Sequence, residues 1–384
     1  MRKRVLIPMV ALIVLPIIYL AIAYTDLEPV AGLRDLYIET AMSTMTHQYL
    51  AKIFPRDVVE AAMEGVDEQF ELNKIAETLP LDRSAVKART DRSVRMAGKD
   101  MDPYATLRDL FPELDMETVK ANVEPEQIAT LSVEGDDTGI RTVHGDKVYA
   151  LNVPEEILII NIESPSYNGM LAISARPEAC VVGLNRDRNK GQTVTEICDN
   201  YSAVLGINGS GFVDPNGRGA GNQAVGLVMS QGVLSGDQEF DRYQIGGMDV
   251  NDNFVVGYGL DLNTLRDAVQ FYPLLVSGGK KAATGSYGMG IQPRACIGQN
   301  ARGDMMFLVI DGRQVGHSIG ITVPECADIL LKYGCYVAMN LDGGSSASMT
   351  YDGKMITRTS SPKSDGRYLP NAWIVLRKNA EADD

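Results

Sequence analysis

An apolar run followed at once by a polar glycine turn decides the fold: residues 336–346 read YVAMNLDGGSS. The start of this stretch suits a buried strand. Two adjacent glycines directly after a strand allow a tight turn with converging backbone amides, and Ser345 and Ser346 add hydroxyl donors. Asp342 then stands where the strand ends, a usual place for site residues in sheet proteins. The alternative interpretation is a plain hairpin turn, since Asp-Gly and Gly-Gly are strong turn signals.

A second segment has the same layout. Residues 305–310 form an apolar run that ends in Asp311-Gly312-Arg313. A carboxylate there suits acid–base chemistry, and a guanidinium suits an anion clamp. The alternative is a charged turn with a surface ion pair. His317 and Ser318 follow closely, but proximity in sequence rarely makes a hydrolase triad, so we do not predict one.

Two further segments add polar groups at strand ends. Asn208 and Gly209 follow the apolar run 203–207, and an amide side chain can donate and accept toward a sugar hydroxyl. Arg294 lies in Pro293-Arg294-Ala295 and is a candidate phosphate ligand. Each segment alone is as well explained by a glycine-rich loop or a solvated charge. Four such loops in one chain favour a shared pocket.

Glycine use divides the chain. Residues 1–130 hold 3 of the 37 glycines and residues 131–384 hold the other 34, so tight turns concentrate in the second part. Apolar residues recur at helical spacing in the first part, which predicts a helical stalk or accessory segment over 25–130. We expect the functional domain over 131–380.

Strand-like runs dominate the second part. Thr193 with Glu196 predicts a capped helix to about Asn200, and a second helix is expected over 324–333. The expected fold class is therefore α+β, a mixed β-sheet core with flanking helices, preceded by a transmembrane helix and the helical stalk. The predicted strands lie at 148–153, 157–162, 171–174, 179–184, 203–207, 225–229, 254–256, 305–310, 336–341 and 372–376.

The N-terminus predicts export. Three basic residues lie in 1–4, and the uncharged apolar run 5–24 is long enough to cross a bilayer core of roughly 30 Å as a helix. The positive-inside rule makes 1–4 a cytoplasmic tip and puts the rest outside, as a single-pass protein of the cell membrane. The alternative is a secreted protein, because residues 21–23 read AIA, the small-x-small form of a signal-peptide cleavage site.

Charge and cysteine content exclude some classes of protein. The net charge is −14, and an acidic chain repels a phosphate backbone, so no nucleic-acid partner is expected. Three histidines make a His-rich zinc site a poor prediction. Five cysteines fit an exported protein with at most two disulfides, with Cys180–Cys198 and Cys326–Cys335 as the sequence-near pairs. The alternative is that some are buried small apolar side chains.

Taken in order, these motifs resemble those of the phosphodiester glycosidase family, including its bacterial branch labelled as exopolysaccharide biosynthesis proteins. The resemblance covers roughly 131–378. It is carried by Asn208-Gly-x-Gly-Phe212, Pro293-Arg294, Asp311-Gly-Arg313 with Ser318-x-Gly320, Pro324-Glu325 and Asn340-Leu-Asp-Gly-Gly-Ser-Ser346. This chain departs at Ser210-Gly211-Phe212, where the family often has a further glycine or a second aromatic residue. The resemblance implies hydrolysis that removes an N-acetylglucosamine-like sugar from a sugar-1-phosphodiester in envelope or exopolysaccharide glycans.

The resemblance also implies roles for the residues. Breaking the anomeric C–O bond passes through an oxocarbenium-like state that a carboxylate stabilises, and a phosphate leaving group gains more from cations than from a proton. The carboxylate candidates are Asp342 and Asp311, with Glu325 third. The expected substrate-binding residues are Asn208, Gly209, Arg294, Arg313, Ser318, Gly343, Gly344, Ser345 and Ser346.

Other interpretations stay open at this point. We expect no cofactor and no metal, although the two aspartates are also suited to hold a divalent cation. A non-catalytic carbohydrate-binding or polysaccharide-assembly protein on the same fold is the alternative function. A phosphodiesterase that cuts the P–O bond is a third.

Overall fold

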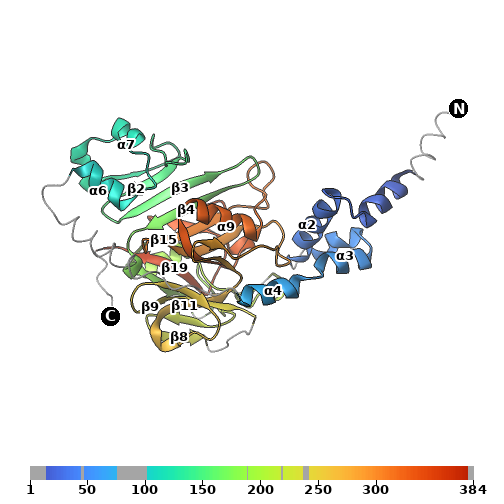
Figure 1. Cartoon of the computed structure of the whole chain (residues 1–384). Helices are drawn as coiled ribbons and strands as arrows, with labels where there is room; N and C mark the ends of the chain where they lie inside the picture. The colour runs from blue at the N-terminus through green and yellow to red at the C-terminus, as the bar shows by residue number, and fades with distance from the viewer. Residues whose placement is uncertain are drawn as a thin grey trace.

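The computed structural model describes residues 14–44, 47–75, 102–187, 189–217, 219–236 and 242–378. Its strands form three sheets (Figure 1). The largest has nine strands in the order β1 (Ser132–Glu134), β2 (Val148–Asn152), β3 (Ile157–Glu163), β4 (Asn168–Ser174), β15 (Met305–Ile310), β14 (Arg294–Asn300), β16 (Cys335–Asn340), β12 (Leu274–Ser277) and β13 (Lys280–Lys281).

The other two sheets have five strands each. One has the order β10 (Phe254–Gly257), β9 (Gln244–Asp249), β11 (Leu265–Phe271), β7 (Val228–Ser230) and β8 (Val233–Gly236). The other has the order β18 (Lys354–Met355), β17 (Met349–Tyr351), β6 (Ala203–Asn208), β19 (Asn371–Leu376) and β5 (Cys180–Leu184).

The predicted α+β class is confirmed, but the expected mixed sheet is wrong. All strand pairings among the described residues are antiparallel. The helix between β15 and β16 does return the chain to the same sheet. However, β14 separates these two strands and pairs antiparallel with both, so no parallel ladder forms between them.

The three sheets share one hydrophobic core. Phe307 of the nine-stranded sheet, Met248 of β9 and Trp373 of β19 are all fully buried in the same cluster. Burial of such large apolar side chains is the main favourable term that holds the sheets together.

Two capped helices complete the domain as the sequence predicts. Helix α9 (Val323–Lys332) packs with the nine-stranded sheet, and Thr322 and Glu325 form its capping box. Helix α8 (Val194–Asn200) packs with β6 and β19, with Thr193 and Glu196 in the same arrangement. Each box satisfies backbone amides that a helix start leaves open.

The helices of residues 103–130 join the core of the nine-stranded sheet. Leu107 and Leu110 of α6 (Pro103–Leu110) are fully buried in one cluster with Leu158 of β3. Helix α7 (Met116–Asn122) follows, and Figure 1 shows both helices beside β2 and β3. This part of the expected stalk therefore packs as a layer of the domain.

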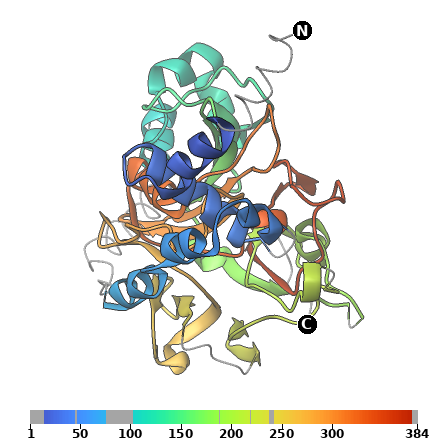
Figure 2. The same cartoon turned by 90° about the vertical axis from the view of Figure 1, so that its right-hand side faces the viewer.

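The helices α2 (Val30–Met42), α3 (Arg56–Met63) and α4 (Val66–Ile75) lie on another side of the sheets (Figures 1 and 2). Asn73 fixes α4, because its amide donates to Leu274 O at 3.0 Å and accepts from Leu274 N at 3.1 Å. Thr40 fixes α2, because its hydroxyl accepts from Ile291 N at 2.9 Å. The N-terminal segment is thus hydrogen-bonded to both ends of the 274–292 stretch.

Part of the predicted membrane segment 5–24 is described. Residues 14–24 are helical, with exposed apolar side chains such as Leu15 and Ile17, whereas residues 1–13 lie outside the described residues. Among the described residues, no helix is both long enough and apolar enough to span a bilayer.

All five cysteines are buried free thiols, so the two sequence-near disulfides are wrong. Cys180 packs in the core shared by the sheets, whereas Cys198 packs in the cluster under α8. Cys326 lies on α9 beside Cys296, and Cys335 donates to Val337 O. Burial raises the pKa of the Cys335 thiol, as expected for an inert apolar side chain.

Candidate active site

All four predicted loop segments contribute to the wall of one cavity of about 870 Å³. Its wall contains Arg294, Arg313 and the turn from Asp342 to Ser346. Phe212, which follows β6, lines it as well. The strand ends therefore converge as the sequence predicts, although Asp311 and Glu325 are not among the lining residues.

Two carboxylates line this cavity, Asp342 and Asp214, and Asp214 is ion-paired with Arg367. Desolvation raises the pKa of Asp342 to about 6, while a hydrogen bond from Ser346, the charge of Arg367 and the Gly343 amide act in the opposite direction. Asp214 adds a further rise through like charge. A carboxyl group with a pKa this close to neutrality is typical of catalytic sites.

Two guanidiniums face the same cavity. Arg294 is only 3% exposed, and its donors bond to carbonyls, with Ile321 O at 3.1 Å and Gly290 O at 2.5 Å. Arg313 is exposed at the mouth, and its Nε donates to Gln292 Oε1 at 2.7 Å. Desolvation and then the charge of Arg294 lower the pKa of Arg313, so the two cations interact.

Neither guanidinium has an ion pair with a carboxylate within the described ranges. Burial also lowers the pKa of Arg294, which shows the cost of holding this charge away from water. Arg294 and Arg313, two cations without a carboxylate partner beside an open cavity, therefore form a binding site for an anion, the anion seat. A planar guanidinium is well suited to bind phosphate oxygens.

An ion pair that sequence reasoning missed borders Asp342. Arg367 pairs with Asp214 at 2.6 Å and donates to Ser345 Oγ at 3.2 Å. The two partners are far apart in the chain and neither lies in a recognisable motif. Their pairing follows from the fold alone.

An aromatic wall was also missed. The ring centroids of Tyr243 and Tyr272 are 4.7 Å apart, and Phe271 stacks on Tyr272 at 5.2 Å. All three line the cavity. Burial, then Tyr272 and Asp342, raise the pKa of Tyr243 to about 12, so its hydroxyl stays a neutral donor. Phe271-Tyr272-Pro273 is the one sequence signal that pointed here.

The N-terminal segment forms another part of the wall. Ser43, Thr44 and His47 line the cavity. Gln292 links this segment to the anion seat, because its Nε2 donates to Thr40 O at 3.1 Å and its Oε1 accepts from Arg313. Residues outside the glycine-rich part of the chain thus contribute to the site.

Asn208 is fully buried and its amide is used within the protein. Its Nδ2 donates to Asp342 O at 2.6 Å and its Oδ1 accepts from Ser348 N at 3.2 Å. This places Asn208 as a brace for the Asp342 turn, in contrast to the expected contact with a sugar hydroxyl. Gly209 lies against Asn371, whose Oδ1 would be 2.1 Å from an added Cβ.

The glycine amides of the turn are also occupied. Gly344 N donates to Pro293 O at 2.9 Å, and the Gly343 amide interacts with the carboxylate of Asp342. The expected cradle of two free amides is therefore absent, because these amides hold the turn and its carboxylate in place. Ser345 lines the cavity and Ser346 is buried behind Asp342.

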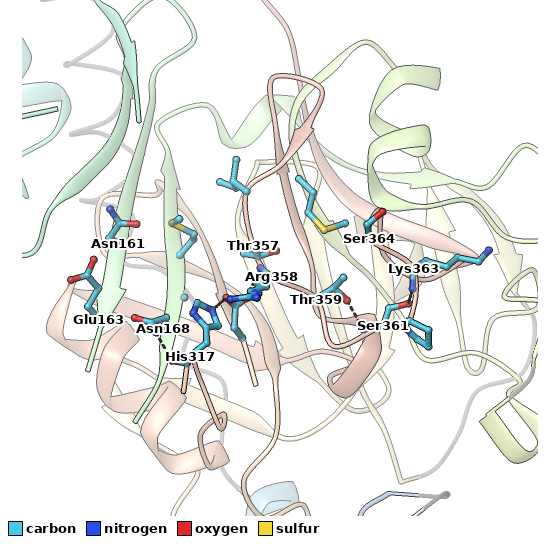
Figure 3. Close-up of a pocket in the computed structure, with 16 residues that line it drawn as sticks. Asn161, Glu163, Asn168, His317, Thr357, Arg358, Thr359, Ser361, Lys363 and Ser364 are labelled. Atoms are coloured by element: carbon cyan, nitrogen blue, oxygen red, sulfur yellow. Dashed lines mark hydrogen bonds and ion pairs between the residues drawn. The ribbon is translucent and has the colours of Figure 1, made fainter. Parts of the chain in front are cut away.

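Asp311, the second carboxylate candidate, opens to a different cavity (Figure 3). Its Oδ2 lies 2.7 Å from His317 Nε2, and its Oδ1 accepts from Arg358 N at 2.9 Å. Ser318 is buried and donates to Asp311 O at 2.6 Å. The loop 357–364, which lies along this second cavity, separates Asp311 from Asp342.

Glu325, the third candidate, lies on the exposed start of α9. Its Oε2 accepts from Thr322 N at 2.7 Å and from Thr322 Oγ1 at 2.7 Å. Its carboxylate therefore caps the helix, and it lines neither cavity. The pattern Thr322-x-x-Glu325 is the sequence signal for this role, whereas the sequence analysis had made Glu325 a catalytic candidate.

The two aspartates do not form a shared cation site. Asp311 and Asp342 line different cavities. Among the described residues, no cluster of three or more His, Cys, Asp or Glu side chains is arranged to hold a metal ion.

The family model for phosphodiester glycosidases matches residues 201–376. This part of the chain is therefore similar to phosphodiester glycosidase domains. The match includes Arg294, Arg313 and Asp342 and ends with β19, and the strands β1 to β5 precede it.

Proteins similar to this chain come from bacteria and a vertebrate. The SPbeta prophage-derived uncharacterized protein YomE of Bacillus subtilis is 29% identical over an alignment of 193 residues, and the match covers 44% of this chain and 27% of YomE. The chain thus spans about a quarter of this curated relative. Among solved structures, the catalytic domain of zebrafish N-acetylglucosamine-1-phosphodiester alpha-N-acetylglucosaminidase, auto-inhibited by its pro-peptide, matches at 18% identity and a TM-score of 0.48, over 57% of this chain and 82% of that one. A hypothetical protein from Synechocystis matches at 15% identity and a TM-score of 0.43, over 61% and 64%.

Proposed function

We propose that this domain hydrolyses sugar-1-phosphodiesters and releases an N-acetylglucosamine-like sugar. The observation that carries this proposal is the meeting of Arg294, Arg313 and Asp342 in one cavity. The two guanidiniums lack a carboxylate partner in the described part of the chain, and a phosphodiester supplies the anion. The family match supports the reaction class.

The guanidiniums of Arg294 and Arg313 bind the phosphate. Arg294 is held by carbonyls from Ile321 and Gly290, so its direction is set before the substrate arrives. Arg313 is held by Gln292. Charge that develops on the leaving phosphate is then stabilised by cations that need no reorganisation.

Asp342 acts on the sugar side. As the anomeric C–O bond breaks, its electron pair passes to the phosphate oxygen and positive charge develops on the anomeric carbon. The carboxylate of Asp342 stabilises that charge, and water supplies the oxygen that completes the sugar. Because the leaving group is a phosphate ester, the reaction needs little protonation. The ionised form of Asp342 is therefore the active form.

The rest of the cavity orients the sugar. The aromatic wall of Tyr243, Phe271 and Tyr272 offers an apolar face for the C–H side of a pyranose ring, while Ser345 adds a hydroxyl. This combination of apolar walls and few polar groups is typical of small-molecule sites.

The first experiment is a hydrolysis assay. The full chain is incubated with N-acetylglucosamine-1-phospho-methylmannoside, and free sugar and phosphate monoester are measured. Release that Asp342→Asn abolishes supports the proposal. A folded sample that binds the substrate without turnover favours the alternative, a carbohydrate-binding or polysaccharide-assembly protein.

The bond that breaks is tested with oxygen-18 water. Cleavage at the anomeric carbon puts the label in the released sugar, whereas cleavage at phosphorus puts it in the phosphate. Label in phosphate would replace the glycosidase mechanism with that of a phosphodiesterase.

We also propose that the domain acts outside the cytoplasm on envelope or exopolysaccharide glycans, anchored by residues 5–24. The uncharged sequence of this segment and the exposed apolar side chains over 14–24 support the proposal. Protease added to intact cells tests it: an extracytoplasmic domain is digested without lysis, and a cytoplasmic one is protected.

A further inference from the structure

Helix α2 exposes apolar side chains, whereas a helix on a water-facing surface normally exposes charged and polar ones. Every exposed residue of α2 is apolar or aromatic: Val30, Leu33 and Tyr37. Their spacing of i, i+3 and i+7 puts the three on one side of the helix. The charged residues of the same helix are all partly buried: Arg34, Asp35 and Glu39. The outward side of α2 is therefore built for an apolar environment.

The neighbouring 3-10 helix η1 (Gln48–Ile53) extends this apolar surface. Tyr49 is 60% exposed and Ile53 is 54% exposed. Tyr37 of α2 joins the two helices, because its ring makes an edge contact with Phe54, which follows η1, with ring centroids 6.0 Å apart. A contiguous exposed patch of this kind marks an interaction surface. We call it the α2–η1 surface: Val30, Leu33, Tyr37, Tyr49 and Ile53.

The chain before α2 is fixed to this surface. Arg34 Nη1 donates to Ala23 O and to Thr25 O, each at 2.9 Å, so the end of the helical residues 14–24 is held against α2. Figure 1 shows residues 14–24 leading away from the sheets, with α2 and α3 between them and the domain. A bilayer that holds this helix therefore meets α2 before it meets the sheets.

The chemistry of the α2–η1 surface suits the boundary between lipid and water. Tyr37 and Tyr49 each combine an aromatic ring with a polar hydroxyl, and such side chains are enriched at membrane interfaces. The surface also continues the uncharged helix before it, since the hydroxyl of Tyr19 donates to Ile53 O at 2.5 Å. This continuity favours lipid over a protein partner as the occupant.

The same segment reaches the catalytic cavity. Ser43, Thr44 and His47, which lie between α2 and η1, line that cavity. Tyr37 precedes Ser43 by less than two helical turns, or about 9 Å along the axis. Thr40 fixes this end of α2 to the cavity wall, because its hydroxyl accepts from Ile291 N at 2.9 Å. The cavity is therefore held close to whatever the α2–η1 surface contacts.

We infer that the α2–η1 surface lies on a lipid bilayer and holds the catalytic cavity there, so that the domain acts on sugar phosphodiesters that are themselves carried by membrane lipids. The substrate part of this inference rests on the proposed function. The membrane contact rests on the apolar surface and its fixed junction with residues 14–24.

The first test is the environment of Leu33 in the full chain, reconstituted in phosphatidylcholine vesicles. The five native cysteines are buried, so a nitroxide label attaches to the cysteine of a Leu33→Cys variant. A label in lipid collides often with oxygen and rarely with a water-soluble nickel complex, and we expect that pattern. Frequent collision with nickel would overturn the inference, and rare collision with both would put a protein partner, such as a second copy of this chain, in place of the bilayer.

The matched control for the label is Val233→Cys. Val233 is 66% exposed against 65% for Leu33, and it lies on β8, far from residues 14–24 in both views of the molecule (Figures 1 and 2). Its label should collide often with the nickel complex, as in water.

The second test is turnover in the same vesicles. The substrates are the water-soluble methyl diester of N-acetylglucosamine-1-phosphate and its hexadecyl diester, which stays in the bilayer. Leu33→Glu should slow hydrolysis of the hexadecyl diester about tenfold, the scale set by removing one leucine from an apolar environment. Hydrolysis of the methyl diester should be unchanged, because Leu33 is exposed and lines neither cavity. Val233→Glu should change neither rate.

The two tests separate this inference from the proposed function. An equal loss for both diesters in Leu33→Glu, or no loss for either, would overturn the inference while leaving the hydrolase in place. Lipid-like collisions at Leu33→Cys without turnover of either diester would keep the membrane contact and reject the hydrolase.

Discussion

Gln292 accepts a hydrogen bond from Arg313 at 2.7 Å while its amide nitrogen donates to Thr40 O and to Ser43 Oγ. One side chain thus couples the N-terminal segment to a cation of the anion seat. Arg313 has no ion pair with any described carboxylate, so Gln292 is what sets its direction.

Gln292→Ala should therefore weaken substrate binding. A freed Arg313 loses its fixed direction, so we expect KM for a sugar phosphodiester to rise about tenfold with a smaller change in kcat. Steady-state kinetics measure both. Gln292→Glu is the informative companion, because its charge would pair with Arg313 and compete with phosphate, raising KM further. A fall in kcat alone would contradict a positioning role.

Arg313→Ala should raise KM more than Gln292→Ala, by about 10- to 100-fold, because a charge-assisted contact to phosphate is lost. The fold should tolerate this change, since Arg313 lies exposed at the cavity mouth. The matched control is Arg56→Ala, whose side chain is 91% exposed on α3. Added salt should raise KM for the wild type and have less effect on Arg313→Ala. An equal salt effect in both would argue against a phosphate contact.

Much of the domain was predictable because local patterns there agree with the fold. The capping box of α8 and the Pro324 start of α9 gave these two helices, and the turn after β16 gave Asp342. Nine of the nineteen described strands were not predicted, and for two of them the physical reason is clear. β11 buries Asp267, which pairs with Arg266 and accepts from Val182 N, and β9 carries Gly246 and Gly247, so neither reads as an apolar run.

The site was predictable only in part, because sequence shows strand ends but not what lies between them. Asp311 and Asp342 both follow strands of one sheet, yet the 357–364 loop separates their cavities. Arg367 and Asp214 meet through the fold alone. Asn208 was predicted to contact the substrate, but its burial behind Asp342 depends on packing that no motif shows.

Asp342→Asn should reduce kcat by at least about 100-fold, the usual scale for losing a catalytic carboxylate. The free energy of unfolding of the Asp342→Asn variant should not fall. The folded-state pKa of about 6 lies above the ordinary value for aspartate, so the folded state binds the proton more tightly than the unfolded state. The wild type therefore loses stability as pH rises from about 4 to about 6. At pH 7 the Asn variant should unfold at an equal or higher temperature, which calorimetry measures. Lower stability with unchanged turnover would make Asp342 structural.

The pH dependence of kcat/KM should follow Asp342. Because the ionised form is active and a phosphodiester stays ionised throughout, kcat/KM should rise with pH and level off above about 6. Asp342→Glu should retain some activity with a shifted midpoint. Asp311→Asn serves as control, since Asp311 lines the other cavity and should leave the midpoint in place. A rate that falls above pH 6 would instead assign Asp342 the role of an acid.

Leu110→Ala tests whether residues 103–130 belong to the core of the domain. Leu110 is fully buried in the cluster that contains Leu158, so truncation leaves a cavity and should cost about 2–5 kcal/mol of unfolding free energy. Leu33→Ala is the matched control, because Leu33 is 65% exposed on α2 and its truncation should cost under about 0.5 kcal/mol.

Denaturant unfolding of the full chain, followed by the fluorescence of the single buried tryptophan, Trp373, measures the unfolding free energy of both variants. Since Trp373 lies in the core shared by the three sheets, a lower midpoint for Leu110→Ala at that probe would show that α6 and the sheets unfold together. An unchanged Trp373 transition would show instead that α6 unfolds as a separate unit.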